Sequence, residues 1–157
     1  MNYQDKVGDF AKRTQVNLGR IEKSRIDGEE VFEATQFINS LLGLIVFPKE
    51  KYYFSIPEIP LDELVENGWP RIHVVGDFKP APNLREQMRY LRNAVAHFNM
   101  DFIPDEDDVI AGIRVWNLKG EKMNWQAEIP LTDLRLLVEK FIDLILDETS
   151  NEINVGL

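Results

Sequence analysis

The chain has 157 residues, of which 44% are hydrophobic and 29% charged, a composition typical of one folded domain and not of a disordered segment. It contains no cysteine, which excludes disulfide bonds, thiolate metal ligands and a cysteine nucleophile. The net charge of −9 argues against broad, sequence-blind binding to nucleic acid.

The charge is unevenly distributed along the chain. Residues 1–26 hold six Lys and Arg against three Asp and Glu, whereas residues 98–157 hold five against thirteen. Any site for a polyanion is therefore expected near the first part of the chain. The first residues show no signal-peptide core, and the longest apolar run, residues 41–47, is too short to cross a bilayer. We expect a cytoplasmic protein that makes no membrane contact.

Two helices are predicted in the first 47 residues. The first has one apolar stripe and ends at the turn signal of residues 26–28. The members of this stripe are Tyr3, Val7, Phe10, Thr14, Leu18 and Ile21. The second, residues 29–47, is apolar around so much of its circumference that we expect it to be central, and Pro48 ends it.

Residues 48–82 contain six of the eight prolines. We expect this segment to wrap the core as extended chain, with one short helix at residues 61–67. Its expected apolar anchors are Tyr52, Tyr53, Phe54, Ile56 and Trp69.

Residues 83–99 carry the most regular helical stripe, formed by Leu84, Met88, Leu91, Val95 and Phe98. Asn83 is the expected N-cap of this helix. Residues 109–129 alternate with period two around the turn sequence "LKGE", which predicts a β-hairpin, and a last helix is expected to follow with Thr132 as its N-cap. The sequence thus predicts one domain over residues 1–157 that is mainly α, and α+β in detail: a helical bundle with a β-hairpin inserted before the C-terminal helix.

The stretch "YLRNAVAHFNMDF" places an arginine and a histidine off the core stripe of its helix. On a helical wheel Arg92 lies to one side of the stripe, while Asn93 and His97, four residues apart, share another face. Imidazole can act as general base or acid near neutral pH, and guanidinium binds phosphate through two parallel hydrogen bonds. Such a group could deprotonate a ribose 2′-hydroxyl and stabilise charge on a phosphate without a metal ion. The spacing alone favours a solvated helix face, because an Arg and a His five residues apart occur often by chance.

The sequence "LRNAVAHFN", an Arg-Asn-x-x-x-His near the end of a helix, resembles the signature of the HEPN family (higher eukaryote and prokaryote nucleotide-binding domains). The stretch "FEATQFINSLLGLIVFPKEKYY" resembles the second-helix region of a prokaryotic subgroup with plasmid and defence-associated members. The resemblance covers roughly residues 32–146. It implies a small helical bundle and a metal-independent endoribonuclease that cuts single-stranded RNA to a 2′,3′-cyclic phosphate, with the motifs of two protomers facing one cleft in a homodimer.

Carried over to this chain, the resemblance makes Arg92 the phosphate clamp, His97 the general acid or base, and Asn93 the polar orienter. We expect additional RNA contacts from Arg89 and Arg85 on the same helix and from Arg13 and Arg20 on the first helix; for the latter two, an ordinary exposed face is an equal alternative. No cofactor and no metal are expected. A toxin or defence role implies an antitoxin protein as a possible partner.

One position departs from the family pattern. Many relatives carry Gly directly after the motif histidine, whereas this chain has Phe98, which the stripe assigns to the core. Because some HEPN proteins have lost catalysis, the alternative function is a non-catalytic interaction module that partners a nucleotidyltransferase antitoxin or another defence component.

Three further features are assigned structural roles. His73 is expected to be a packed or edge-strand residue rather than a catalytic one. The acidic run at residues 105–108 is expected to form a solvated turn, because consecutive carboxylates point in different directions and make a poor metal cage. Trp116 and Trp125 are expected to pack in the core rather than to stack on bases.

Overall fold

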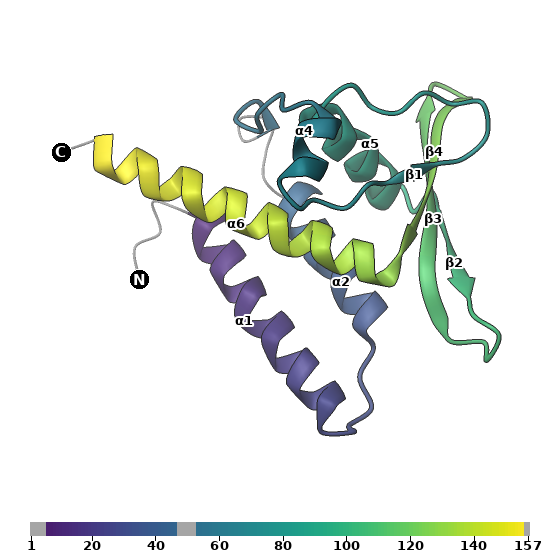
Figure 1. Ribbon diagram of the computed structural model, residues 1–157, viewed down its shortest axis with the longest axis horizontal. Coiled ribbons are helices and arrows are strands. Elements are labelled where there is room, and N and C mark those ends of the chain that lie inside the picture. Colours follow the sequence, from purple (N-terminus) through teal and green to yellow (C-terminus); the bar gives the residue numbers. More distant parts are fainter. Residues whose placement is uncertain (1–5, 47–52, 156–157) are drawn as a thin grey trace.

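The computed structural model of the protein describes residues 6–46 and 53–155, in which helices form one part of the molecule and an antiparallel sheet the other (Figure 1). The helical elements are α1 (Lys6–Ile26), α2 (Glu33–Leu41), the π-helical turn η1 (Leu42–Val46), α4 (Leu61–Glu66), α5 (Leu84–Ala96) and α6 (Leu131–Val155). The strands are β1 (His73–Val74), β2 (Met100–Pro104), β3 (Ile110–Lys119) and β4 (Lys122–Pro130). Among the predicted residues, Tyr3, Pro48 and Tyr52 lie outside the described part.

The predicted fold class is wrong in its balance of elements, because the protein has a mixed α+β fold. The predicted hairpin is present as β3 and β4, but it is the centre of a four-stranded sheet with the order β1-β4-β3-β2. β2 pairs with β3 from Met100 to Pro104, and β1 pairs with β4 at His73 and Val74. Neither outer strand could be recognised from its period, since β1 has two residues and β2 has adjacent exposed residues at Asp101 and Phe102.

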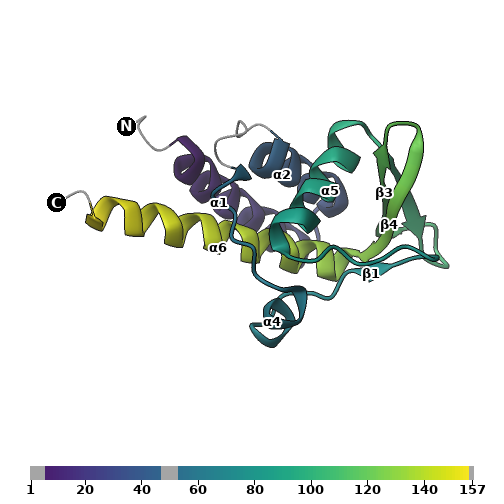
Figure 2. The ribbon, with the colours of Figure 1, turned by 90° about the horizontal axis from the view of Figure 1, so that it is seen from above.

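Helix α5 lies between the helices and the sheet. In Figure 2, α1, α2, α5 and the β3–β4 pair follow one another across the molecule, and α6 runs along one side of them. The buried residues of α5 are Leu84, Gln87, Met88, Leu91, Ala94 and Val95, which confirms the predicted stripe except at its end. On the sheet side, Trp125 of β4 is buried, and its ring lies 5.4 Å from that of Tyr90, centroid to centroid. The site residues of α5 are therefore held from both sides.

The first two helices meet where α2 changes into a π-helical turn. Phe10 of α1 packs its ring onto Gly43 of η1, in the space where a Cβ would sit if this residue were not glycine. Phe10 nevertheless stays 41% exposed, and the buried residues of α1 are Gly8, Ala11, Thr14 and Leu18. The buried face of α1 is thus turned away from the predicted stripe and toward the small residues of the helix. Small side chains at the contact allow two helices to approach closely.

Several predicted boundaries are confirmed, and others shift by a few residues. α1 ends at Ile26, and α4 matches the short helix predicted at residues 61–67. The second helix begins at Glu33 instead of residue 29, and the last begins at Leu131, so that Thr132 lies in its first turn and is not its N-cap. Among the anchors of the wrapping segment, Ile56 is buried whereas Phe54 is 68% exposed.

Candidate functional site at the C-terminal end of helix α5

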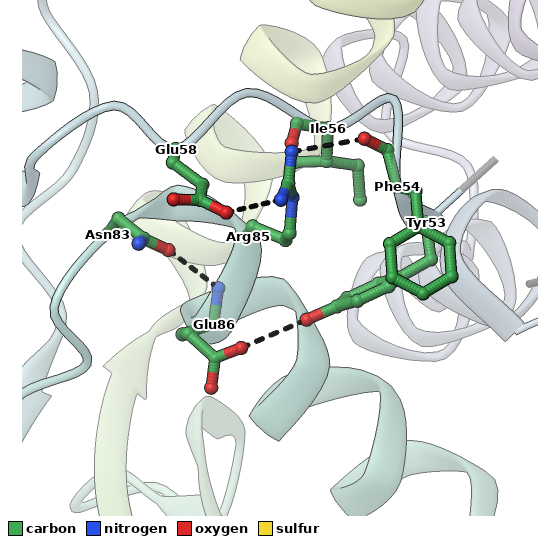
Figure 3. A network of polar contacts seen from close by, with 7 residues as sticks. All are labelled: Tyr53, Phe54, Ile56, Glu58, Asn83, Arg85 and Glu86. Atoms are coloured by element: carbon green, nitrogen blue, oxygen red, sulfur yellow. Dashed lines mark hydrogen bonds and ion pairs between the residues drawn. The ribbon is translucent and has the colours of Figure 1, made fainter.

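The N-terminal end of α5 is fixed to the segment that precedes α4 (Figure 3). Asn83 caps the helix as predicted, since its side chain accepts a hydrogen bond from the backbone N–H of Glu86 at 3.0 Å. Arg85 pairs with Glu58 and donates to the carbonyl oxygens of Ile56 (2.7 Å) and Phe54 (3.0 Å). Arg85 therefore closes the wrapping segment onto α5, and an RNA contact from this residue would have to compete with three partners in its own chain.

Tyr53 adds a second link at this end of the helix. Its hydroxyl donates to the carboxylate of Glu86 at 3.1 Å, and Glu86 also forms an ion pair with Arg89. Burial raises the pKa of the Tyr53 hydroxyl above its usual value, and the hydrogen bond to the Glu86 carboxylate and its charge raise it further. The guanidinium carbon of Arg92 lies 5.5 Å from the centre of the Tyr53 ring, a cation–π contact. Arg92 is thereby held at the edge of this cluster.

The C-terminal end of α5 carries the motif histidine. His97 is the C-cap residue, and its backbone N–H donates to the carbonyl of Asn93 at 3.2 Å. The N–H of Phe98 donates to Val95 and that of Asn99 to Ala94, at 3.2 and 2.8 Å, which is the Schellman pattern of helix termination. The side chain of His97 is exposed. The helix end thus presents the imidazole to solvent.

The assignment of Phe98 to the core is wrong. Phe98 is 69% exposed and has a φ of +54°, because it is the residue after the C-cap, where a Schellman motif requires the left-handed conformation. Glycine adopts that conformation without steric cost, which gives a physical reason for the Gly that many HEPN relatives carry after the motif histidine. The helix ends at Ala96, two residues before Phe98, so the helical period does not extend to it.

A relay of hydrogen bonds joins the motif to the hairpin. Arg92 Nη2 donates to Asn93 Oδ1 at 3.2 Å, and Asn93 Nδ2 donates to Asn117 Oδ1 of β3 at 3.0 Å. Asn117 Nδ2 donates in turn to Asn124 Oδ1 of β4 at 2.6 Å. Because guanidinium can only donate, it fixes the direction of every bond in the relay. Asn93 therefore links Arg92 to the hairpin, instead of forming the side-chain bond to His97 that the helical spacing had allowed.

An open hollow of about 370 Å³ lies beside these residues. It is lined by Asn93, His97, Asn99, Asn117, Leu118 and Gly120. Its polar lining consists of asparagine amides and one imidazole, which can donate to and accept from a polar ligand without carrying a fixed charge. Arg92 is not one of the lining residues; its permanently charged guanidinium is joined to the hollow only by its hydrogen bond to Asn93.

The four arginines expected to contact RNA do not gather at one place. Arg89 is on α5, paired with Glu86, with its guanidinium carbon 5.5 Å from the centre of the Tyr90 ring. Arg13 and Arg20 line a separate open hollow of about 500 Å³ on α1, where Arg13 pairs with Asp9 at 2.8 Å. Helix α2 lies between α1 and α5 in Figure 2. The basic face of α1 is therefore a surface apart from the motif.

Sequence reasoning missed Asn117 and Asn124, which position the motif from the hairpin. Asn117 is 4% exposed, one of a few buried polar residues among those described. A signal was present in the sequence, since an asparagine at an inward position of an alternating strand is unusual and must find a hydrogen-bond partner. That partner, Asn93, lies 24 residues away and could not be identified without the fold.

The features assigned structural roles behave largely as expected. His73 is exposed on the edge strand β1, and Trp125 is buried, whereas Trp116 is only partly buried. The acidic run forms the turn between β2 and β3, where Asp105 Oδ1 accepts the backbone N–H of Asp107 and of Val109, both at 2.9 Å.

No group of three or more His, Asp or Glu side chains suited to binding a metal ion is found among the described residues. No helix in residues 6–46 or 53–155 is both long and apolar enough to span a membrane.

Comparison with known proteins decides the family. The family model described as HEPN pEK499 p136 matches residues 1–152. The chain belongs to this HEPN family. No curated protein and no solved structure matches it significantly.

Membership places the Arg-Asn-x-x-x-His of α5 in a HEPN domain, as its resemblance had implied. A HEPN domain is consistent with a nucleotide-binding or ribonuclease-like function. The match extends over the hairpin and most of α6, so the strands that bear Asn117 and Asn124 lie within the matched region. This HEPN protein therefore combines the family motif with a sheet that supports it.

Proposed function

We propose that this HEPN protein is a metal-independent endoribonuclease that cuts single-stranded RNA, with an active site shared across a homodimer and a toxin or defence role. The observation that carries the proposal is the grouping of the three motif residues at one end of α5: Asn93 and His97 line a hollow open to solvent, and Arg92 donates a hydrogen bond to Asn93. The three residues differ in what they offer a substrate: a fixed cation, a neutral amide and an accessible imidazole.

The proposed reaction is transfer of the phosphoryl group from one ribose oxygen to another. His97, in its neutral form, removes the proton of a ribose 2′-hydroxyl, and the freed oxygen attacks the adjacent phosphorus. The bond from phosphorus to the 5′-oxygen of the next nucleotide breaks, and that oxygen takes up a proton. The products are a 2′,3′-cyclic phosphate and a 5′-hydroxyl end. The guanidinium of Arg92 stabilises the negative charge on the non-bridging oxygens as the transition state forms.

A second copy of the chain completes this site in our proposal. One protomer carries a net charge of −9, and two facing copies of Arg92 would concentrate positive potential where the phosphate binds. Two exposed apolar side chains also support contact with another protein surface: Leu118, which lines the hollow, is 39% exposed, and Phe98, which follows His97 in the chain, is 69% exposed. Phe98 retains a large apolar side chain in a strained conformation, which an interface contact would compensate.

Cleavage of a labelled single-stranded RNA in EDTA tests the catalytic claim. Wild type is expected to form a 2′,3′-cyclic phosphate, and His97→Ala to lower the rate about 100-fold or more, the usual contribution of a general acid or base. His73→Ala is the matched control, since the chain has two histidines and His73 is exposed on β1. Equal rates for wild type and His97→Ala, or a requirement for a divalent ion, would contradict the proposal.

A cysteine cross-link tests the shared site. The chain has no cysteine, so Ala96→Cys introduces a single thiol at an exposed position next to His97. Facing motifs predict a rapid disulfide cross-link between the two protomers on mild oxidation, whereas Gln15→Cys on the exposed face of α1 is expected to form no cross-link. A stoichiometric protein partner that co-purifies with the chain, with no cleavage by the freed protein, would support the non-catalytic alternative instead.

A further inference from the structure

A separate apolar hollow lies where α2, β3 and α6 begin. It encloses about 300 Å³ and shares no lining residue with the hollow beside His97. Its lining is mainly apolar and includes Val31, Phe32, Ala34, Val109, Ile110 and Leu131. We call it the α2 hollow.

Two large apolar side chains of the α2 hollow are exposed to solvent. Phe32 is 70% exposed and Val109 is 59% exposed, and neither belongs to the hydrophobic core. Val31, Ile110 and Leu131 line the same hollow and are only partly buried. Apolar surface gathered in this way is unfavourable in water and marks a place where another molecule binds.

An acidic turn is attached to one side of the α2 hollow. The four acidic residues 105–108 directly precede Val109. The backbone N–H of Asp105 donates to the carbonyl of Val109 at 2.8 Å, and Asp105 Oδ1 accepts the backbone N–H of Val109 at 2.9 Å. These two hydrogen bonds hold the turn at Val109, so its carboxylates stay close to the exposed apolar surface.

The other exposed apolar residue, Phe32, also has acidic neighbours. Glu29 and Glu30 shortly precede it in the chain, and both are exposed. Glu33, which lines the hollow, is paired with Arg25 at 3.1 Å. Within the described ranges, by contrast, no ion pair is formed by the carboxylates of the acidic rim, which we define as Glu29, Glu30, Glu106, Asp107 and Asp108. The rim therefore carries uncompensated negative charge beside the apolar surface.

The combination of an apolar hollow and an acidic rim defines the partner. Negative charge repels the phosphates of nucleic acids and of anionic lipids, and it attracts lysine and arginine. We infer that the α2 hollow docks a segment of another protein in which large apolar side chains are flanked by lysines or arginines. The inference does not depend on the proposed ribonuclease function.

A second copy of the chain is a less suitable occupant. Its first helix, α1, carries basic residues and the exposed Val16, and so has similar chemistry. A contact between α1 of one copy and the α2 hollow of another is head-to-tail, however, and such contacts form open chains unless the rotation closes a ring. We therefore assign the hollow to a different protein.

The probe is a fluorescein-labelled peptide of alternating leucine and lysine pairs, observed by fluorescence anisotropy with the whole chain. Wild type is expected to bind it saturably, and more weakly as the salt concentration rises. A peptide with serine in place of leucine keeps the charge and is expected to bind about tenfold more weakly. Equal binding of the two peptides would show attraction by charge alone and would overturn the inference, as would the absence of saturable binding.

Substitutions locate the binding surface. Phe32→Ser and Val109→Ser are each expected to weaken binding of the leucine peptide about tenfold, because less apolar surface is buried. Phe54→Ser is the matched control, since Phe54 is 68% exposed but does not line this hollow. Melting curves verify that the variants are folded. Binding of wild-type strength by both Phe32→Ser and Val109→Ser would place the peptide elsewhere and would overturn the inference.

The contribution of the acidic rim is tested by charge removal. The double variant Glu106→Gln with Asp107→Asn is expected to weaken binding about threefold. The matched control is Glu63→Gln with Glu66→Gln on α4, which lies well apart from the turn between β2 and β3 in both ribbon views (Figures 1 and 2). Equal weakening by the two double variants would show that only the overall charge matters, which contradicts the docking site.

Sedimentation velocity distinguishes the two occupants. Phe32→Ser is expected to have the same oligomeric state as wild type, because the α2 hollow receives a different protein. Loss of self-association in Phe32→Ser but not in Phe54→Ser would identify a second copy of the chain as the occupant and would overturn the inference.

Discussion

The two ends of helix α5 are built in opposite ways. At the N-terminal end, Arg85 and Glu86 are engaged by the segment before α4 through a carboxylate, two carbonyl oxygens and a tyrosine hydroxyl. At the C-terminal end, His97 and Phe98 are exposed, and the side chain of Asn93 is bonded to the neutral amide of Asn117 and to the guanidinium of Arg92. Similar side chains on one helix therefore serve different purposes: charge is satisfied internally at one end and remains available at the other.

This difference separates stability from activity along about four turns of helix. Changes at the N-terminal end are expected to alter the free energy of unfolding, whereas changes at the C-terminal end are expected to alter chemistry at little cost in stability. Function is expected where polar groups are held in place but are not already paired within the protein. Residue type alone does not identify those groups.

The largest expected effect on stability is at Arg85. Arg85→Met removes the donors to Phe54 and Ile56 and leaves Glu58 unpaired, and the side chain is only 23% exposed. We expect the free energy of unfolding to fall by about 2 kcal/mol, measured by urea denaturation. Arg71→Met is the matched control, because its pair with Asp62 is exposed and is expected to contribute about 0.5 kcal/mol or less. Equal losses of unfolding free energy in the two variants would contradict the role of Arg85 in holding the wrapping segment onto α5.

The next effect concerns the relay. Asn117→Leu keeps the size of the side chain but leaves Asn93 and Asn124 without their partner, so the amide that bonds Arg92 loses its anchor on the hairpin. We expect kcat for RNA cleavage to fall about tenfold with little change in KM, the pattern of a positioning residue. Asn39→Leu, on the exposed face of α2, is expected to be neutral. A rise in KM at unchanged kcat would instead indicate that Asn117 contacts the substrate directly.

A smaller effect, of opposite sign, is expected at Phe98. Phe98→Gly relieves the left-handed conformation of a non-glycine residue and is expected to raise the free energy of unfolding of the monomer by about 0.5–1 kcal/mol. The same change removes an exposed aromatic side chain at the proposed interface, so dimerisation and cleavage are expected to weaken. Denaturation and light scattering on the same samples measure both. A variant that is more stable and also dimerises as well as wild type would show that Phe98 has no role in the interface.

The sequence predicted most of the helices because their apolar stripes are long. The stripe of α5, its Asn83 cap and the β3–β4 hairpin were all readable from local pattern. The outer strands were not, because β1 is too short for a period and β2 exposes two neighbouring residues. The spacing of Phe98 matches the apolar stripe, but its backbone is not helical. Its left-handed conformation belongs to the end of the helix, so the spacing does not predict its burial.

The candidate site was predictable only in part for a similar reason. Arg92, Asn93 and His97 lie within six residues, so one helix and a family signature bring them together. Asn117 and Asn124 join them from the hairpin through contacts that depend on how α5 packs on the sheet. That packing is a tertiary property, and a single sequence does not contain it in readable form.

The smallest expected effect concerns Tyr53, which contacts the N-terminal end of α5. Burial and the Glu86 carboxylate raise the pKa of Tyr53, so folding favours its neutral form. The stability contributed by its hydrogen bond, about 0.5 kcal/mol at this partly exposed site, is therefore complete below the usual tyrosine pKa of about 10 and is lost as the pH rises through the higher folded value. The absorbance at 295 nm of wild type minus that of Tyr53→Phe isolates this group among the four tyrosines. Glu86→Gln removes the negative charge beside Tyr53 but keeps a hydrogen-bond acceptor, so this variant is expected to have a lower Tyr53 pKa than wild type. If Tyr53 of wild type titrates with a midpoint at or below about 10, the hydroxyl is not held by burial and Glu86 as described.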